Sequence, residues 1–208
     1  MIDLTDPTEN IQHYSQANGR EPGWQISHHV PLDQRQQLVG RYILYGGLHT
    51  ATDLGCADGS LLIGLMQSRI IQRGYGCDLW HDGVAWGQGY INTNHLDIQL
   101  VEMSVYDYQG PTTDVTVLGE ILEHLTDPIQ ALRVAARQSS TVIITVPISR
   151  PPLTDEERSR LLVTPEEHIN TYDSVTLRAQ CATAGLRVDR EEMIGTGWVN
   201  LVALARRI

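Results

Sequence analysis

The stretch Ala51–Leu62, with the sequence A-T-D-L-G-C-A-D-G-S-L-L, decides the fold of this chain. It reads as a buried strand, then a tight turn that carries acids and glycines, then the start of a helix. Doubly wound α/β domains use this arrangement to present backbone groups to a nucleotide-like ligand at the carboxyl end of a strand. The sequence therefore predicts such a domain, with its ligand site at this turn.

The residues of the turn indicate an adenosine-containing ligand that has no phosphate. A pyrophosphate-binding loop has the pattern G-x-G-x-x-G, and a Walker loop has a lysine, and this turn has neither. Asp53 and Asp58 would repel a phosphate, whereas they favour a cationic ligand such as a sulfonium or an amine. The missing phosphate loop also disfavours a nicotinamide dehydrogenase.

Composition is typical of a globular protein with one domain. The 208 residues are 41% hydrophobic, which suffices for a single sizeable core. No apolar run could span a membrane, the acidic N-terminus is unlike a signal peptide, and three scattered cysteines form no zinc pattern. We therefore expect one domain over residues 1–208, a cytoplasmic location and no membrane partner. The net charge of −10 disfavours a nucleic-acid substrate, which usually requires a basic face.

The run D-L-G-C-A-D-G at 53–59 resembles the first motif of class I S-adenosylmethionine-dependent methyltransferases, D-x-G-x-G-x-G. Ala57 replaces the middle glycine, and the resemblance extends from about Thr50 to the C-terminus. It implies an α/β fold, a Rossmann-like doubly wound sheet with helices on both faces. The sheet would be mostly parallel, with one antiparallel strand and the order 3-2-1-4-5-7-6. The implied cofactor is S-adenosyl-L-methionine.

Hydrophobic periodicity and turn residues divide the chain into alternating strands and helices. The expected strands are 50–56, 74–78, 98–104, 113–119, 141–146, 186–193 and 198–205. The expected helices are 31–48, 59–71, 81–93, 128–138 and 172–184. A short glycine-bearing turn joins the last two strands, which predicts a hairpin and hence the antiparallel strand. Residues 1–48 would form an N-terminal helical cap, and residues 147–171 an insertion near the substrate site.

The family resemblance assigns the residues that would hold the adenosine half of the cofactor. Asp78 ends the second strand, where the family places an acid that accepts hydrogen bonds from both ribose hydroxyls. The alternative interpretation of Asp78 is a turn-forming aspartate. Leu79 would pack on the adenine face, and backbone groups around Ser104 and Val105 would recognise the adenine edge.

The methionyl half would lie between the first and fourth strands. Asp53 and Gly55 would approach the amino group, and Gly119 and Glu120 would lie near the sulfonium. The predicted cofactor-binding residues are Asp53, Gly55, Cys56, Ala57, Gly59, Asp78, Leu79, Ser104, Val105, Gly119 and Glu120.

A second resemblance lies in V-T-V-L-G-E-I-L-E-H-L-T-D-P at 115–128, which matches E-x-x-E-H-x-x-D-P of many small-molecule and some RNA methyltransferases. If a helix begins near Glu120, spacings of three and four place Glu120, Glu123 and His124 on one face. His168 follows in P-E-E-H-I-N-T-Y, where the family often has a histidine that approaches this helix. Glu120, Glu123, His124 and His168 would together suit a divalent cation, Mg, Mn, Fe or Zn.

Two interpretations of this set stay open. A metal would orient an acceptor hydroxyl and lower its pKa. Without a metal, His124 and His168 would pair with Glu123 as a structural lock, and His124 would be the catalytic general base, since imidazole titrates near neutral pH.

Three functions fit these residues. The leading one is an S-adenosylmethionine-dependent methyltransferase that acts on oxygen or nitrogen of a small molecule. The alternatives are a metal-assisted RNA 2′-O-methyltransferase, which the acidity disfavours, and a non-catalytic cofactor-binding partner subunit. No motif identifies the methyl acceptor or the oligomeric state.

Overall fold

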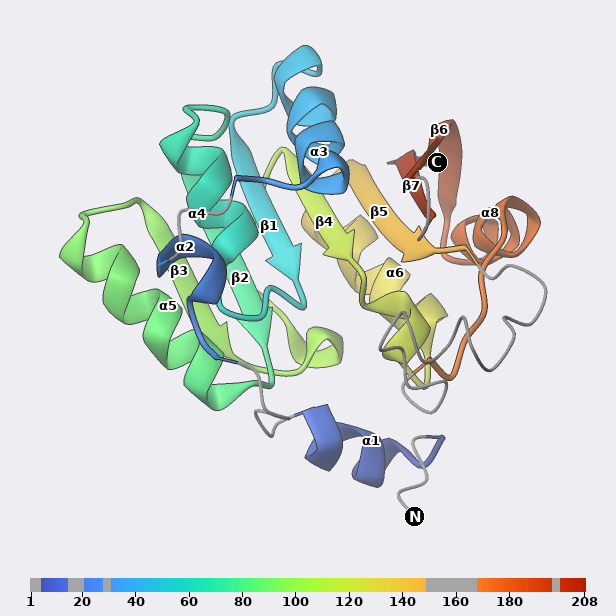
Figure 1. The fold of residues 1–208 in the computed structure, drawn as a ribbon. Helices are drawn as coiled ribbons and strands as arrows, with labels where there is room; N and C mark the ends of the chain where they lie inside the picture. The colour runs from blue at the N-terminus through green and yellow to red at the C-terminus, as the bar shows by residue number, and fades with distance from the viewer. Residues whose placement is uncertain (1–4, 15–20, 28–30, 149–167, 196–198) are drawn as a thin grey trace.

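The computed structural model of the protein describes residues 5–14, 21–27, 31–148, 168–195 and 199–208. Within them, seven strands form one sheet with the order β3-β2-β1-β4-β5-β7-β6 (Figure 1), which confirms the predicted order. The strands are β1 Thr50–Leu54, β2 Arg73–Asp78, β3 Ile98–Glu102, β4 Val115–Gly119, β5 Thr141–Pro147, β6 Leu186–Ile194 and β7 Asn200–Arg207.

Helices of different lengths surround this sheet in the described part of the chain. They are α1 Pro7–Tyr14, α2 Trp24–Ser27, α3 Gln34–Tyr45, α4 Ser60–Gln67, α5 His81–Thr93, the 3-10 helices η1 Val105–Asp107 and η2 Leu122–His124, α6 Pro128–Gln138 and α8 Ser174–Thr183. Most of the predicted insertion, residues 149–167, lies outside the described part of the chain.

The sheet is mostly parallel, as predicted. Strands β1 to β5 pair in parallel, whereas β7 pairs antiparallel with both β5 and β6. The antiparallel pairing of β6 with β7 confirms the predicted hairpin arrangement of the last two strands. The carboxyl ends of β1, β2 and β4 therefore meet at one edge, where open α/β sheets bind their ligands.

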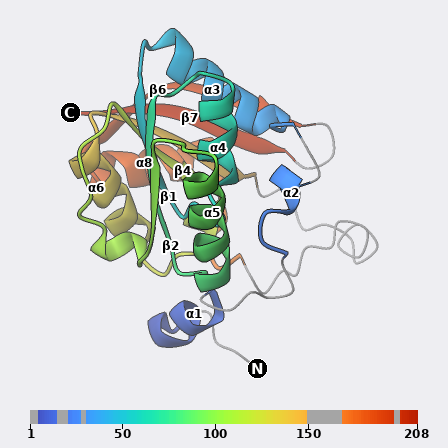
Figure 2. The same cartoon turned by 90° about the vertical axis from the view of Figure 1, so that its left-hand side faces the viewer.

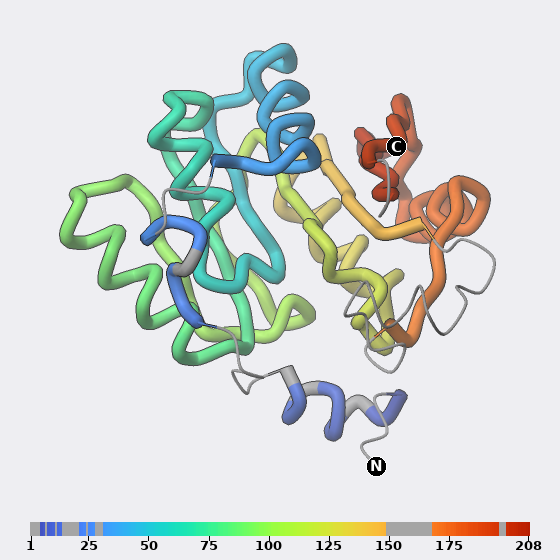
Figure 3. The backbone as a smooth tube through the Cα atoms, viewed as in Figure 1, coloured from blue at the N-terminus to red at the C-terminus, as the bar shows by residue number. Residues whose placement is uncertain are grey.

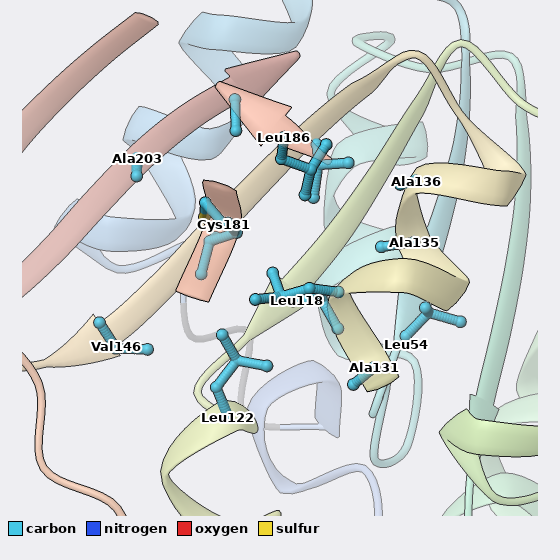
Figure 4. Close-up of a cluster of buried hydrophobic side chains, with 14 of the residues drawn as sticks. Leu54, Leu118, Leu122, Ala131, Ala135, Ala136, Val146, Cys181, Leu186 and Ala203 are labelled. Atoms are coloured by element: carbon cyan, nitrogen blue, oxygen red, sulfur yellow. The ribbon is translucent and has the colours of Figure 1, made fainter. Parts of the chain in front are cut away.

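Two helix layers cover the sheet. Figure 2 shows α3, α4 and α5 on one side and α6 and α8 on the other. Each layer closes its own core of aliphatic side chains. Figure 4 shows the core beneath α6 and α8, where Leu118, Leu122 and Val146 pack with Leu186 and small alanines. Parallel strands that are buried on both faces explain the nearly continuous apolar runs of β4 and β5.

Helix α3 is shorter than its prediction at both ends. Asp33 caps its first turn by accepting a hydrogen bond from Gln36 N (2.7 Å), and the Gln36 side chain accepts one from Asp33 N. Gly46 caps the other end, and Gly47 follows with φ +63°. These caps give the helix definite ends inside the predicted range 31–48.

Helix α1 lies apart from both helix layers. The backbone tube in Figure 3 shows it beyond the end of the sheet toward which β1 points. Asn10 attaches it there, because Asn10 Nδ2 donates to His124 O (2.8 Å). The described part of the N-terminal segment therefore reaches the edge where the carboxyl ends of the strands meet.

Gly87 allows α5 to pack closely on the turn after β1. A Cβ atom at Gly87 would lie 2.3 Å from Asp58 O, a backbone atom that cannot rotate away. We expect Gly87→Ala to lower the free energy of unfolding by about 1–3 kcal/mol, the usual cost of overpacking. Gly89→Ala on the same helix is the matched control, because a Cβ there would meet nothing within 4 Å.

In the control, alanine should raise the free energy of unfolding by up to about 1 kcal/mol through helix propensity. Urea denaturation of both variants measures the difference. Equal stability of Gly87→Ala and Gly89→Ala would contradict the close contact.

Candidate active site

The turn between β1 and α4 is built from three residues with left-handed backbone. Gly55 has φ +83°, Ala57 φ +50° and Gly59 φ +76°. Ala57 thus occupies a conformation that favours glycine, which explains why the related motif has glycine there. Gly59 is the N-cap of α4 and has no side chain to cap it, so the only side-chain acceptor that the described residues offer to Ser60 N is Asp58.

Asp78 holds this turn against the end of β2. Its Oδ2 accepts a hydrogen bond from Ala57 N (2.8 Å), and its Oδ1 accepts one from Trp80 N (2.9 Å). Cys77 O accepts from both Gly55 N and Cys56 N. A carboxylate offers about four acceptor positions, more than these two amides take. Asp78 therefore has a structural role in the turn, which the sequence analysis gave as the alternative interpretation of this residue.

Asp58 holds the N-terminal segment to the same turn. Its Oδ2 accepts from Gly23 N (2.8 Å), and its Oδ1 accepts from Ser60 Oγ (2.6 Å) and Ser60 N (3.1 Å). Three donors therefore bind the carboxylate that the sequence analysis expected to repel phosphate, and they give it a structural role at the start of α4.

Asp53 lies at the end of β1 with only 3% of its surface exposed. Its Oδ1 is buried and accepts no hydrogen bond from the described residues. Burial and, to a smaller extent, the negative charge of Asp78 raise the pKa of Asp53 from 3.8 to about 7, although the positive charge of Arg35 opposes both. A buried acceptor without a donor is costly, so this atom is suited to receive a donor from a ligand.

The raised pKa of Asp53 predicts a pH-dependent stability. Between pH 3.8 and about 7 the folded protein holds a proton on Asp53 that the unfolded chain has released. The contribution of this proton to the free energy of unfolding is therefore complete below pH 3.8 and is lost as the pH rises to about 7. Asp53→Asn cannot ionise. The difference in the free energy of unfolding, Asp53→Asn minus native, should therefore increase by a few kcal/mol between pH 3.8 and about 7. Above that range the difference should stay constant.

Urea denaturation of both proteins between pH 4 and pH 8 measures this difference. Gly89→Ala, which changes no ionisable group, controls for general effects of pH. A difference that is independent of pH would show that Asp53 ionises normally.

Arg35, in the first turn of α3, places a positive charge among the acids of the site. Its Nη1 donates to Thr145 Oγ1 (3.2 Å), and its side chain is 19% exposed. It lowers the pKa values of Asp53, Glu120 and Glu123, against the effect of burial. Nothing in the sequence singled out Arg35, because it belongs to an amphipathic helix with no motif. A Cβ at Gly119 would lie 3.5 Å from its Nη1, so the predicted Gly119 adjoins this guanidinium.

Glu120 follows β4 and does not begin a helix, so that prediction is wrong. Its φ is +55°, and its N donates to Thr145 O (3.0 Å) and Thr145 Oγ1 (3.1 Å) of the neighbouring strand. Its Oε1 in turn accepts from Thr145 Oγ1 (3.0 Å). These contacts bind Glu120 to β5, and the single 3-10 turn of η2 starts two residues later.

Glu123, His124 and His168 come together beyond the end of β4. One ligand atom from each lies within 4.8 Å of the others, and Glu120 is not part of this group. The two imidazole rings meet edge to face with centroids 4.8 Å apart, and His124 Nε2 lies 3.8 Å from Glu123 Oε1. Glu123 is 1% exposed. Burial is the main cause that raises its pKa, and the negative charge of Glu120 raises it further.

The other predicted residues lie at the same edge of the sheet. Met103 N donates to Asp78 O (2.9 Å), which brings the end of β3 beside the end of β2. Strand β3 ends at Glu102, so Ser104 lies just beyond it and caps η1, with Val105 buried. Leu79 is half-buried next to Asp78. Cys56 is buried, and burial raises the pKa of its thiol, which makes it a poor nucleophile.

A separate groove of about 1050 Å³ runs between α2, α3 and α4. It is lined by Ser60 of the turn, but by none of Asp53, Asp78 or Glu123. We therefore do not assign the ligand to this groove. Within the described ranges, each helix is too short or too polar to cross a membrane.

A family model described as a methyltransferase domain matches residues 50–191. The chain belongs to the class I S-adenosylmethionine-dependent methyltransferases. The matched range contains the turn after β1, Asp78 and the Glu123–His124–His168 group. No curated protein sequence matches the chain.

Solved structures of this methyltransferase fold resemble the chain closely in shape and distantly in sequence. Magnesium protoporphyrin IX methyltransferase (ChlM) from Synechocystis PCC 6803 with bound S-adenosylhomocysteine (SAH) has a TM-score of 0.70 at 18% identity, covering 92% of this chain and 90% of that one. Mitomycin 7-O-methyltransferase MmcR has a TM-score of 0.66 at 18% identity, covering 100% and 68%. The [4+2]-cyclase SpnF has a TM-score of 0.69 at 15% identity, covering 100% and 93%. At these identities the likeness shows the fold alone.

Proposed function

We propose that the protein binds S-adenosyl-L-methionine and transfers its methyl group to an oxygen or nitrogen atom of a small molecule. The observation that carries this proposal is Asp53, a buried carboxyl group beside a left-handed turn that is tied to Asp78. One of its oxygens accepts no hydrogen bond from the part of the chain that the structure describes. A sulfonium ligand with an ammonium group fits such an acidic site better than a phosphate does. Family membership and the small-molecule methyltransferases among the similar structures support the same proposal.

Each residue of the proposed cofactor site has a separate role. Asp78 would accept hydrogen bonds from the ribose hydroxyls, and Asp53 would accept one from the amino group. Arg35 would pair with the carboxylate of the methionyl part, since guanidinium groups bind carboxylates in a fork geometry. When bound, S-adenosylmethionine supplies a methyl group activated by its sulfonium, so the protein needs only to bind, align and desolvate.

On the acceptor side, His124 would remove the proton from the acceptor. Its ring is half-buried beside Glu123 and His168. An imidazole near neutral pH suits this task, and the carboxylate beside it would stabilise the charge that it gains. We further propose that residues 1–208 form a single domain, in which the cap over 1–48 and the segment 147–171 select the acceptor.

A metal-assisted reaction is a second candidate, favoured by the close grouping of Glu123, His124 and His168. One carboxylate and two imidazoles are ligands that Mn, Fe and Zn accept. Such an ion would lower the pKa of an acceptor hydroxyl, as an RNA 2′-O-methyltransferase would require. The net charge of −10 disfavours RNA as the acceptor. A non-catalytic, cofactor-binding partner subunit is a third candidate. One similar structure is a complex of a putative methyltransferase with the activator Trm112, so proteins of this fold can act with a partner.

Calorimetric titration with SAH tests the proposal, first in EDTA and then with added Mg or Mn. We expect micromolar binding in EDTA, about −8 kcal/mol, if the cofactor site is as proposed. Heat from metal addition that disappears in His168→Ala would support the metal-assisted reaction. No binding of SAH under either condition would overturn the proposal of an independent enzyme.

A further inference from the structure

Four consecutive carbonyl groups, from Leu122 to Leu125, are bound by donors from distant parts of the chain. A 3-10 turn leaves most of its carbonyls without partners of its own. The internal bonds of η2 run from His124 N to Ile121 O (2.9 Å) and from Leu125 N to Leu122 O, which is long at 3.4 Å. Asn10 donates to the carbonyl of His124 (2.8 Å). The remaining three carbonyls all accept from Asn170.

Asn170 alone makes three of these contacts. Its backbone N donates to Glu123 O (3.0 Å). Its Nδ2 donates to both Leu122 O (3.1 Å) and Leu125 O (2.6 Å). Tyr172 Oη, which has a single proton to donate, lies 3.3 Å from Leu122 O and 3.0 Å from Gln180 Oε1. A primary amide has two N–H donors on one nitrogen, and no other side chain as short as asparagine offers them.

These bonds link the two segments that carry the Glu123–His124–His168 group. Asn170 lies two residues after His168, so its position along the chain limits where His168 can reach. Its three bonds span the carbonyls on both sides of Glu123 and His124. The 4.8 Å separation of the two imidazole rings therefore depends on a bond network that neither ring makes itself.

We propose that Asn170 is the positioning residue of the Glu123–His124–His168 group. It fixes η2 in its 3-10 conformation and holds His168 against it. The importance of this group for turnover rests on the proposed function, whereas the positioning itself does not. The test therefore uses the protein without cofactor, metal or acceptor.

Nuclear magnetic resonance of ¹³C-histidine-labelled protein tests the proposal. Asn170→Ala should shift or broaden the ring signals of His124 and His168 and leave that of His49 unchanged. Spectra at pH 8, where ordinary imidazoles are neutral, avoid effects of protonation. Assignment uses His124→Gln and His168→Gln. The matched control is Asn94→Ala, which also removes an amide bond to a backbone carbonyl, that of Tyr90 (2.9 Å), on α5.

Unchanged His124 and His168 signals in a folded Asn170→Ala protein would overturn the proposal. So would equal changes in Asn94→Ala. If Asn170→Ala does not fold, hydrogen exchange of the native protein decides. The Asn170 backbone amide should then exchange at least about tenfold more slowly than an unstructured amide. Rapid exchange of this amide in the native protein would likewise overturn the proposal. A failure of the proposed function would instead appear as absent SAH binding with both results intact.

Discussion

Asp78→Ala should weaken the binding of SAH by at least about 100-fold, because a hydrogen bond to a charged group contributes about 1.5–3 kcal/mol and two ribose hydroxyls are involved. The same change removes the acceptor of Ala57 N and Trp80 N, so the turn after β1 also loses its attachment to β2. Both effects act in the same direction. Calorimetric titration of the folded variant measures the dissociation constant.

Asp107→Ala is the matched control for Asp78→Ala. Asp107 is an exposed carboxylate just beyond the predicted adenine residues Ser104 and Val105, and its removal should leave SAH affinity unchanged. Asp78→Asn separates the two effects, because an amide keeps one acceptor for the turn but loses the charge. Native affinity in Asp78→Ala would rule out Asp78 as the ribose residue.

The fold could be predicted from the sequence because its determinants are local. Helices α5 and α6 begin and end where the sequence analysis predicted, and apolar runs and turns placed the ends of the strands within one or two residues. The order of the strands came instead from the family resemblance. On helix propensity alone, the glycines of α5 would weaken this helix. Gly87 instead permits contact with the turn after β1, a reason that becomes visible only when the two elements are packed together.

The site was less predictable where side chains meet across long sequence separations. Arg35 reaches Thr145 across 110 residues, and Asn10 reaches His124 across 114. Neither residue belongs to a motif, and periodicity shows only which face of a helix is buried. Glu120 shows the same limit, because its contacts with Thr145 on the neighbouring strand overrode the helical spacing that suggested a shared face.

His124→Ala should leave SAH affinity unchanged and lower turnover by about 10²–10⁴-fold, the usual contribution of a general base. The variant removes the imidazole but keeps the backbone carbonyl that Asn10 binds. Turnover is measured as SAH formed with an acceptor found in a panel of phenols, hydroxy acids and amines. His49→Ala, the same substitution at an exposed residue beside Asp114 at the other end of the sheet, should have full activity.

His168→Ala then distinguishes the two roles proposed for His124. If His124 is a general base held by its neighbours, loss of His168 should cost less than loss of His124, because the base itself is retained. If both histidines bind a cation, either variant should lose activity to the same extent, and added Mn should restore neither. Full activity in His124→Ala would exclude both roles. Methyl transfer would then depend on alignment and desolvation alone, which suffices for an acceptor that is already a good nucleophile at neutral pH.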